Sequence, residues 1–226
     1  MEVVINTSVN EKFHLYAIFL VGSLIVGQVI PIIKLHKYKI SNDVLVIASI
    51  LNIMLALGFG LVYTVLTSRR LVLGFSSIGG LIGVIIGTLI FSIILKQYRS
   101  QIIKEFLITI PLIYSISKIG CLMAGCCQGI YCNKFFYITY IKENLTESVL
   151  PIQLLESIVF MIIYLVAIKK ELNTYRLMQL CSLGKLILEF FRQSNIDKIL
   201  NINQIICILI LLITLIIEMG MKRNGQ

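Results

Sequence analysis

Apolar segments long enough to cross a lipid bilayer recur along almost the whole chain. A helix that spans the hydrocarbon core needs about 20 mostly apolar residues. Seven segments come close to this length, at about residues 14–33, 44–66, 72–95, 106–124, 150–168, 175–191 and 201–219. The chain is 58% hydrophobic and 14% charged, which is outside the usual range of soluble proteins. The sequence therefore predicts an all-α integral membrane protein, a bundle of about seven transmembrane helices.

No polar stretch is long enough to fold separately, so we expect a single polytopic membrane domain over residues 1–226. The longest polar gap runs from about Gln128 to Ser148. The first apolar segment lacks both a basic region before it and a small-residue cleavage site after it. We therefore expect a retained helix at this end of the chain rather than a removed signal peptide.

Lys and Arg residues lie mostly in the short loops between apolar segments, where they signal membrane topology. One set of alternate loops, with the C-terminus, holds eleven of them: Lys34, Lys37, Lys39, Lys96, Arg99, Lys104, Lys169, Lys170, Arg176, Lys222 and Arg223. The opposite set holds seven: Lys12, Arg69, Arg70, Lys134, Lys142, Arg192 and Lys198. This bias predicts an N-terminus outside and a C-terminus in the cytoplasm. The net charge of +9 is thus explained by topology, and no nucleic-acid partner is expected.

Four charged side chains fall inside the expected spans, where insertion of each costs roughly 2.5 to 3.5 kcal/mol. They are Lys118, Glu156, Lys185 and Glu189. Because they are two cations and two anions, they could offset this cost by pairing with one another near the helix ends. The alternative is that they line a functional pocket.

Helical spacing favours the pocket. Lys185, Glu189 and Arg192 follow one another at four and then three residues, which puts them on one helix face. Gln153 and Glu156 share a face in the same way. A bundle that turns both faces inward would enclose a polar, charged pocket suited to an anionic lipid headgroup.

Small residues and cysteines supply two further patterns. The first is a group of glycines near the start of the third span, which could serve close helix packing, ligand contact or both: Gly74, Gly79, Gly80, Gly83 and Gly87. The second is a cysteine cluster: Cys121, Cys126, Cys127 and Cys132. The cluster could form a disulfide, a metal site or a reactive thiol, but it lacks the two-residue spacing of a CxxC motif and a nearby histidine. We therefore expect no metal.

Four sequence blocks in order resemble the prolipoprotein diacylglyceryl transferases. They are GFSSIGGLIG at 74–83, KIGCLMAGCCQG at 118–129, PIQLLE at 151–156 and GKLILEFFR at 184–192. The resemblance covers roughly residues 72–195 and agrees with the expected topology over the whole chain.

The resemblance implies transfer of the diacylglyceryl group of phosphatidylglycerol to the lipobox cysteine thiol of a prolipoprotein, in a bacterial inner or cytoplasmic membrane. It implies no cofactor and no metal, and its partners are phosphatidylglycerol, the lipobox peptide and membrane lipid. Lys118 and Lys185 would hold the departing phosphate. The implied substrate-binding residues are Gly79, Gly80, Gly120, Gly129, Gln153 and Arg192.

The chain departs from the family pattern at several implied site positions. Lys118 and Lys185 stand where the family usually has arginine, so the charge is kept while the planar fork that grips a phosphate is lost. Ile78 stands where a histidine usually precedes the paired glycines, which removes a candidate base. Glu156 and Glu189 are then the buried groups expected to accept a proton, unless neighbouring lysines activate the thiol.

Similar departures elsewhere leave other functions open. Leu150 replaces a second family histidine, and Cys121, Ala124 and Cys126 replace asparagines and a glutamate, as in cysteine-bearing members. One alternative is a non-catalytic or altered-substrate relative that binds a phospholipid or membrane peptide in the same pocket. The others are a membrane thiol oxidoreductase using the cysteine cluster and a small-solute transporter.

Overall fold

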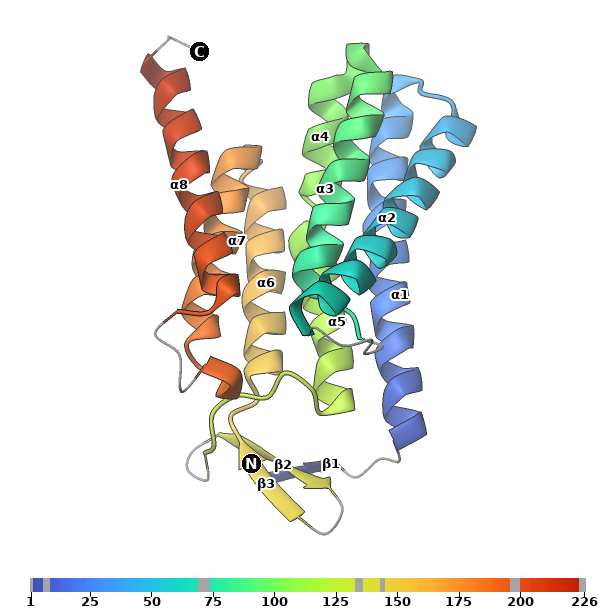
Figure 1. Ribbon diagram of the computed structural model, residues 1–226. Helices are drawn as coiled ribbons and strands as arrows, with labels where there is room; N and C mark the ends of the chain where they lie inside the picture. Colours follow the sequence, from blue (N-terminus) through green and yellow to red (C-terminus); the bar gives the residue numbers. More distant parts are fainter. Residues whose placement is uncertain are drawn as a thin grey trace. The chain divides into compact units, whose positions relative to one another are not determined.

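Helices dominate the computed structural model, which describes residues 2–5, 9–68, 74–132, 136–142, 145–195 and 200–223 (Figure 1). The α-helices are α1 (Val9–Leu35), α2 (Asn42–Ser68), α3 (Ser77–Ile94), α4 (Arg99–Leu107), α5 (Ile110–Ala124), α6 (Ile152–Lys169), α7 (Thr174–Glu189) and α8 (Ile202–Arg223). Short 3-10 helices are η1 (His36–Tyr38), η2 (Lys96–Tyr98) and η3 (Gln193–Asn195). Each predicted span contains a helix, but the third begins only at Ser77, the fourth is divided between α4 and α5, and residues 72 and 73 lie outside the described residues.

Six stretches within the described residues are long and apolar enough to cross a membrane: His14–Tyr38, Asn42–Thr67, Ser77–Ile94, Lys96–Ala124, Ile152–Lys169 and Ile202–Met221. The predicted fold class, an all-α integral membrane protein, is confirmed. The segment predicted at 175–191 forms α7, whose 16 residues make it shorter than these six. The orientation of the termini stays a prediction.

A small sheet was not foreseen from the apolar pattern. It consists of β1 (Glu2–Ile5), β2 (Tyr137–Lys142) and β3 (Leu145–Val149), in the order β1-β2-β3. β1 pairs with β2 in parallel and β2 with β3 in antiparallel fashion. Ile138, Tyr140 and Val149 form its buried core against Leu122 of α5. The strands of the long polar gap between α5 and α6 therefore pack on the end of α5.

The chain divides into two compact units, which we describe separately. Unit 1 comprises Met1–Ser23 and Tyr114–Gln226, and unit 2 comprises Leu24–Ile113. The single membrane domain expected over residues 1–226 stays a prediction. All of the charged residues expected inside the membrane, Lys118, Glu156, Lys185 and Glu189, belong to unit 1.

In unit 2, the glycines of α3 let this helix approach α2 closely. A Cβ added at Gly79 would meet the backbone oxygen of Phe59, and one at Gly83 would meet that of Leu55. At Gly87 an added Cβ would collide with the side-chain oxygen of Asn52. The four-residue spacing of these glycines thus serves close helix packing, which was one of the two roles expected from the sequence.

In unit 1, α5, α6 and α7 pack through a core of Ile152, Phe160 and Leu188. The ring of Tyr114 on α5 lies 4.3 Å from that of Phe160 on α6, measured between centroids. α7 begins where the Asn173 side chain accepts a hydrogen bond of 2.8 Å from the backbone N–H of Arg176, a typical N-cap. These contacts fix the helices that carry the charged side chains.

Candidate functional site

The carboxylate of Glu156 is the centre of a buried charged cluster in unit 1. Its Oε2 lies 2.9 Å from the Lys118 ammonium, and its Oε1 lies 2.7 Å from that of Lys185. The Nη2 of Arg192 is 2.9 Å from both oxygens. The hydroxyl of Tyr114 donates a further hydrogen bond of 2.8 Å to Oε1. Glu156 is fully buried, so these donors replace the water that the charge has lost.

Glu189 forms the second acidic part of the cluster. Its Oε2 lies 2.7 Å from the Lys185 ammonium and 3.4 Å from Nε of Arg192. Its Oε1 accepts a hydrogen bond of 3.0 Å from the Asn203 side chain on α8. The Asn195 side chain donates to the backbone oxygen of Glu189 at 2.7 Å. The i, i+4 and i, i+3 spacing from Lys185 to Arg192 therefore produces real contacts, as the sequence predicted.

Cations outnumber carboxylates in this cluster. Lys118, Lys185 and Arg192 supply three positive charges and Glu156 and Glu189 two negative ones, which leaves a net charge of +1. None of the five residues is more than 9% exposed. Burial alone would lower the pKa of Arg192, but the carboxylate of Glu156 outweighs it and raises that pKa well above its usual value. A buried excess of positive charge is a suitable place for an anion.

Tyr114 is the member of the cluster that sequence reasoning missed. Besides its hydrogen bond to Glu156, its ring lies 4.9 Å from the Lys118 ammonium and 5.4 Å from that of Lys185. Both distances are within the range of a cation–π interaction. The signal was present, because Tyr114 precedes Lys118 by one helical turn on the same face of α5.

The loop after α5 joins the end of α7 beside the cluster. Gly129 forms an isolated β-bridge with Arg192, and the N–H of Gln193 donates to the backbone oxygen of Gln128 at 3.2 Å. An added Cβ at Gly129 would lie 2.5 Å from the backbone oxygen of Leu150, so only glycine fits there without rearrangement. This bridge explains how Arg192, which follows α7, is held against Glu156.

Two buried side-chain amide atoms next to the cluster have no hydrogen-bond partner among the described residues. They are Oε1 of Gln153 and Nε2 of Gln128. The other amide atom of Gln153, Nε2, donates to the backbone oxygen of Cys126 at 2.6 Å. Because buried polar atoms are rarely left unpaired, these atoms are candidates for hydrogen bonds to a bound ligand.

The predicted site residues thus divide into groups. Lys118, Glu156, Lys185, Glu189 and Arg192 come together, and Gln153 and Gly129 lie at the adjoining loop. Gly120 instead faces α1, since an added Cβ would lie 2.7 Å from Cβ of Phe19. Gly79 and Gly80 belong to unit 2, where Gly79 packs on α2 and Gly80 on Phe75.

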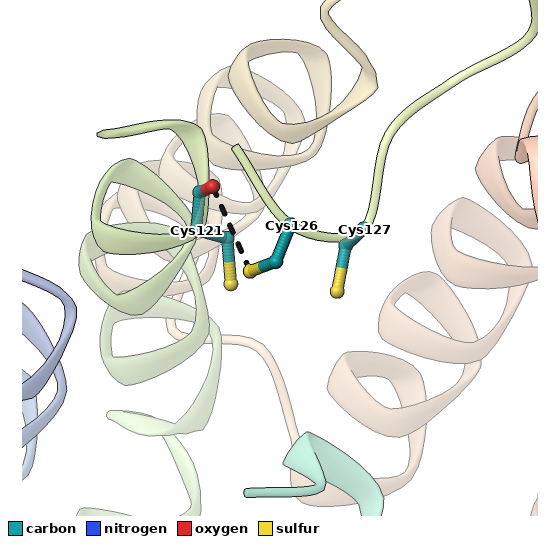
Figure 2. Close-up of side chains that lie close together, drawn as sticks. All are labelled: Cys121, Cys126 and Cys127. Carbon is teal, nitrogen blue, oxygen red and sulfur yellow. Dashed lines mark hydrogen bonds between the residues drawn. The ribbon is translucent and has the colours of Figure 1, made fainter. Parts of the chain in front are cut away.

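Three cysteine thiols gather at the end of α5 (Figure 2). The sulfur atoms of Cys121, Cys126 and Cys127 all lie within 4.8 Å of one another. Hydrogen bonds from the thiols of Cys121 and Cys126 hold the pKa of Cys127 well below its usual value, and nearby Lys118 and Arg192 act in the same direction. The same thiol contacts raise the pKa of Cys126. Cys132, the fourth cysteine of the predicted cluster, is not a member of this group of three.

The chain matches the model of a known protein family. A family model described as prolipoprotein diacylglyceryl transferase matches residues 2–219, nearly the whole chain. No curated protein matches it. The matched range includes every residue of the charged cluster and all three clustered cysteines.

Proposed function

Because the chain belongs to the prolipoprotein diacylglyceryl transferase family, we propose that it transfers the diacylglyceryl group of phosphatidylglycerol to the lipobox cysteine thiol of a prolipoprotein. The transfer forms a thioether and releases glycerol phosphate. The observation that carries the choice of donor is the buried net positive charge around Glu156, because the leaving group is an anion.

Lys118, Lys185 and Arg192 are the proposed phosphate-binding groups. Each carries N–H donors that the carboxylates of Glu156 and Glu189 use only in part. Arg192 supplies a planar fork that the lysines lack, which compensates for the family arginines missing at positions 118 and 185. The unpaired amide atoms of Gln153 and Gln128 are candidates to bind the glycerol hydroxyls of the headgroup.

The two carboxylates have different proposed roles. Both oxygens of Glu156 already accept contacts from cationic donors, so its role is to hold the three cations together. Glu189 contacts two of the cations, Lys185 and Arg192, whereas Glu156 contacts all three. Glu189 is therefore the better candidate to receive the proton of the acceptor thiol.

The proposed reaction takes place at the outer face of a bacterial cytoplasmic membrane. The site is formed by the end of α5, the beginning of α6 and the end of α7, and the Lys and Arg bias assigns these ends to the outside. The prolipoprotein would therefore have to present its lipobox cysteine on that side.

A transfer assay tests the function directly. Purified protein in vesicles containing phosphatidylglycerol is incubated with a synthetic lipobox peptide, and mass spectrometry measures the added diacylglyceryl mass. We expect product from the wild type, and a loss of roughly 10²- to 10³-fold in rate for Lys118→Ala and for Lys185→Ala, the magnitude typical of losing one charge-stabilising donor. The control is Lys169→Ala, since Lys169 is exposed at the end of α6 in the same unit.

Two results would contradict the proposal. Folded wild-type protein that gives no product would favour the lipid-binding or altered-substrate alternative. Full activity in both cluster variants would remove the phosphate-binding role from these lysines. Thermal unfolding of each variant in detergent distinguishes lost chemistry from lost structure.

A further inference from the structure

The backbone at the end of α5 directs three thiols to one place. The N–H of Gly125 donates to the backbone oxygen of Leu122, and that of Cys126 donates to the backbone oxygen of Cys121, both at 3.2 Å. This is the Schellman arrangement, with Gly125 in the left-handed region at φ 64°. It returns the chain over the last turn of α5 and brings Cys126 back to Cys121.

Cys127 continues the turn in a conformation that is uncommon for a residue with a side chain. Its φ is 57°, again left-handed. Adjacent side chains on extended backbone point in opposite directions, whereas here the sulfurs of Cys126 and Cys127 lie side by side with that of Cys121 (Figure 2). The Sγ of Cys126 also lies 3.7 Å from the backbone oxygen of Cys121.

Three thiols at this separation match the donor set of a thiophilic metal ion. Zinc binds thiolate sulfur at about 2.3 Å in tetrahedral geometry, which puts the sulfurs about 3.8 Å apart. The observed separations of at most 4.8 Å require side-chain adjustments of about 1 Å or less. Cys121 is buried and Cys127 is exposed, so the group is anchored on one side and accessible on the other.

We propose that Cys121, Cys126 and Cys127 bind a zinc ion as three thiolates and leave its fourth position open for the thiol of the acceptor substrate. The second half of this proposal rests on the proposed transfer function. This proposal departs from the expectation of no metal, which was based on the sequence spacing and on the family resemblance, because the three sulfurs are grouped in space. Among the described residues, that group contains no fourth His, Cys, Asp or Glu. Three protein ligands and one free position are typical of catalytic rather than structural zinc.

The surroundings balance the charge of such a site. Three thiolates and Zn²⁺ carry a net charge of −1, and each thiol gives up its proton to solvent when the metal binds. Lys118 lies one helical turn before Cys121, and both Lys118 and Arg192 are close enough to act electrostatically on Cys127. Gln153 lies on α6 one helical turn before Glu156, and it donates a hydrogen bond of 2.6 Å to the backbone oxygen of Cys126. This bond connects the cysteine turn to the helix that carries the centre of the charged cluster.

An open zinc position supplies what this chain lacks for thiol alkylation. Ile78 stands at the position of the family histidine, and Glu156 is fully engaged by donors. A thiol that coordinates zinc loses its proton, which passes to Glu189 or to water. The resulting thiolate attacks the glyceryl carbon bound to the phosphate oxygen. The C–S bond forms as the C–O bond breaks, and the electron pair leaves with the glycerol phosphate.

Cobalt provides a direct test of the metal site. Full-length protein is purified with a non-thiol reductant, stripped with a chelator and titrated with Co²⁺, whose thiolate charge-transfer band reports sulfur ligands. We expect one equivalent to bind and Zn²⁺ to displace it. Because loss of groups that merely orient a ligand already weakens metal binding by about 10- to 100-fold, Cys126→Ser and Cys127→Ser should weaken it by roughly tenfold or more. Cys132→Ser, on the same loop, should bind normally.

A second titration tests the open position. Adding the lipobox peptide to the cobalt protein should change the charge-transfer band, whereas a peptide with serine in place of its cysteine should not. No thiolate band, or a band that survives both cysteine substitutions, would overturn the metal site. A charge-transfer band that stays unchanged when the cysteine peptide is added would overturn the proposal that the substrate thiol occupies the open position.

Activity measurements separate this proposal from the transfer function. Transfer that persists undiminished in chelated protein and in Cys127→Ser would overturn the role of zinc in transfer and leave the transferase function intact. Cobalt binding without any transfer would instead contradict the proposed function while leaving the metal site standing.

Discussion

At the residue scale, Glu156 determines whether the cations of the site can be buried together. Replacing it by glutamine keeps the shape but leaves Lys118, Lys185 and Arg192 facing a neutral amide. Removing one partner of a buried ion pair costs about 3–5 kcal/mol, so Glu156→Gln should lower the free energy of unfolding by about that amount and abolish transfer. Denaturant unfolding in detergent measures the stability change.

The control for this prediction is Glu171→Gln, because Glu171 is exposed between α6 and α7. Its backbone is left-handed, with φ 45°, and glutamine has to adopt the same conformation as glutamate there. It should unfold like the wild type. An equally stable Glu156→Gln variant would mean that water or lipid already screens the cluster.

Lys118 and Lys185 allow a test in the opposite direction. If their role is to bind a phosphate, then Lys118→Arg and Lys185→Arg should each retain transfer activity within about tenfold of the wild type, because arginine keeps the charge and adds a bidentate fork. Lys118→Ala and Lys185→Ala should lose far more transfer activity than the arginine variants. Initial rates over a range of phosphatidylglycerol fractions in the vesicles would compare them. Arginine variants as inactive as the alanine variants, yet normally folded, would point to a lysine-specific role.

At the element scale, the turn after α5 determines where the cysteines and the Gly129 loop lie. Gly125→Ala should be destabilising by about 1–2 kcal/mol, the usual cost of a left-handed conformation for a residue with a Cβ. The new Cβ would also lie 3.1 Å from the Tyr140 ring. Cobalt binding should weaken in parallel, which a titration of the folded variant would measure.

A glycine inside a regular helix should behave in the opposite way. Gly58 lies within α2, and an added Cβ there meets nothing within 4 Å. Gly58→Ala should therefore be stabilising by about 0.5–1 kcal/mol. Equal effects at Gly125 and Gly58 would show that the turn imposes no conformational requirement.

Different physical signals explain what the sequence could and could not predict. Apolar runs located the helices because lipid demands long hydrophobic segments, and helical spacing put Lys185, Glu189 and Arg192 on one face. The strands at 137–142 and 145–149 were missed because they are short and lie in a polar gap. Tyr114 was missed because a tyrosine in an apolar helix resembles ordinary packing. Its function depends on Glu156, 42 residues away.

At the scale of the whole molecule, the ends of α5 and α7 and the beginning of α6 must lie on one side of the membrane. Figure 1 shows that the sheet of unit 1 lies at this same end, where α5 ends and α6 begins. The distribution of Lys and Arg predicts that this end lies outside and that the connection between α6 and α7 lies in the cytoplasm. The orientation decides which side of the membrane supplies the acceptor peptide.

Chemical labelling of intact cells tests this orientation. Tyr131 is 60% exposed on the loop predicted to lie outside, and Lys170 is exposed at the end of α6. A membrane-impermeant maleimide should modify Tyr131→Cys in intact cells and Lys170→Cys only after lysis, with mass spectrometry separating these sites from the native cysteines. The reverse pattern would invert the topology. The charged cluster would then face the cytoplasm, and the proposed acceptor would have to be modified before its export.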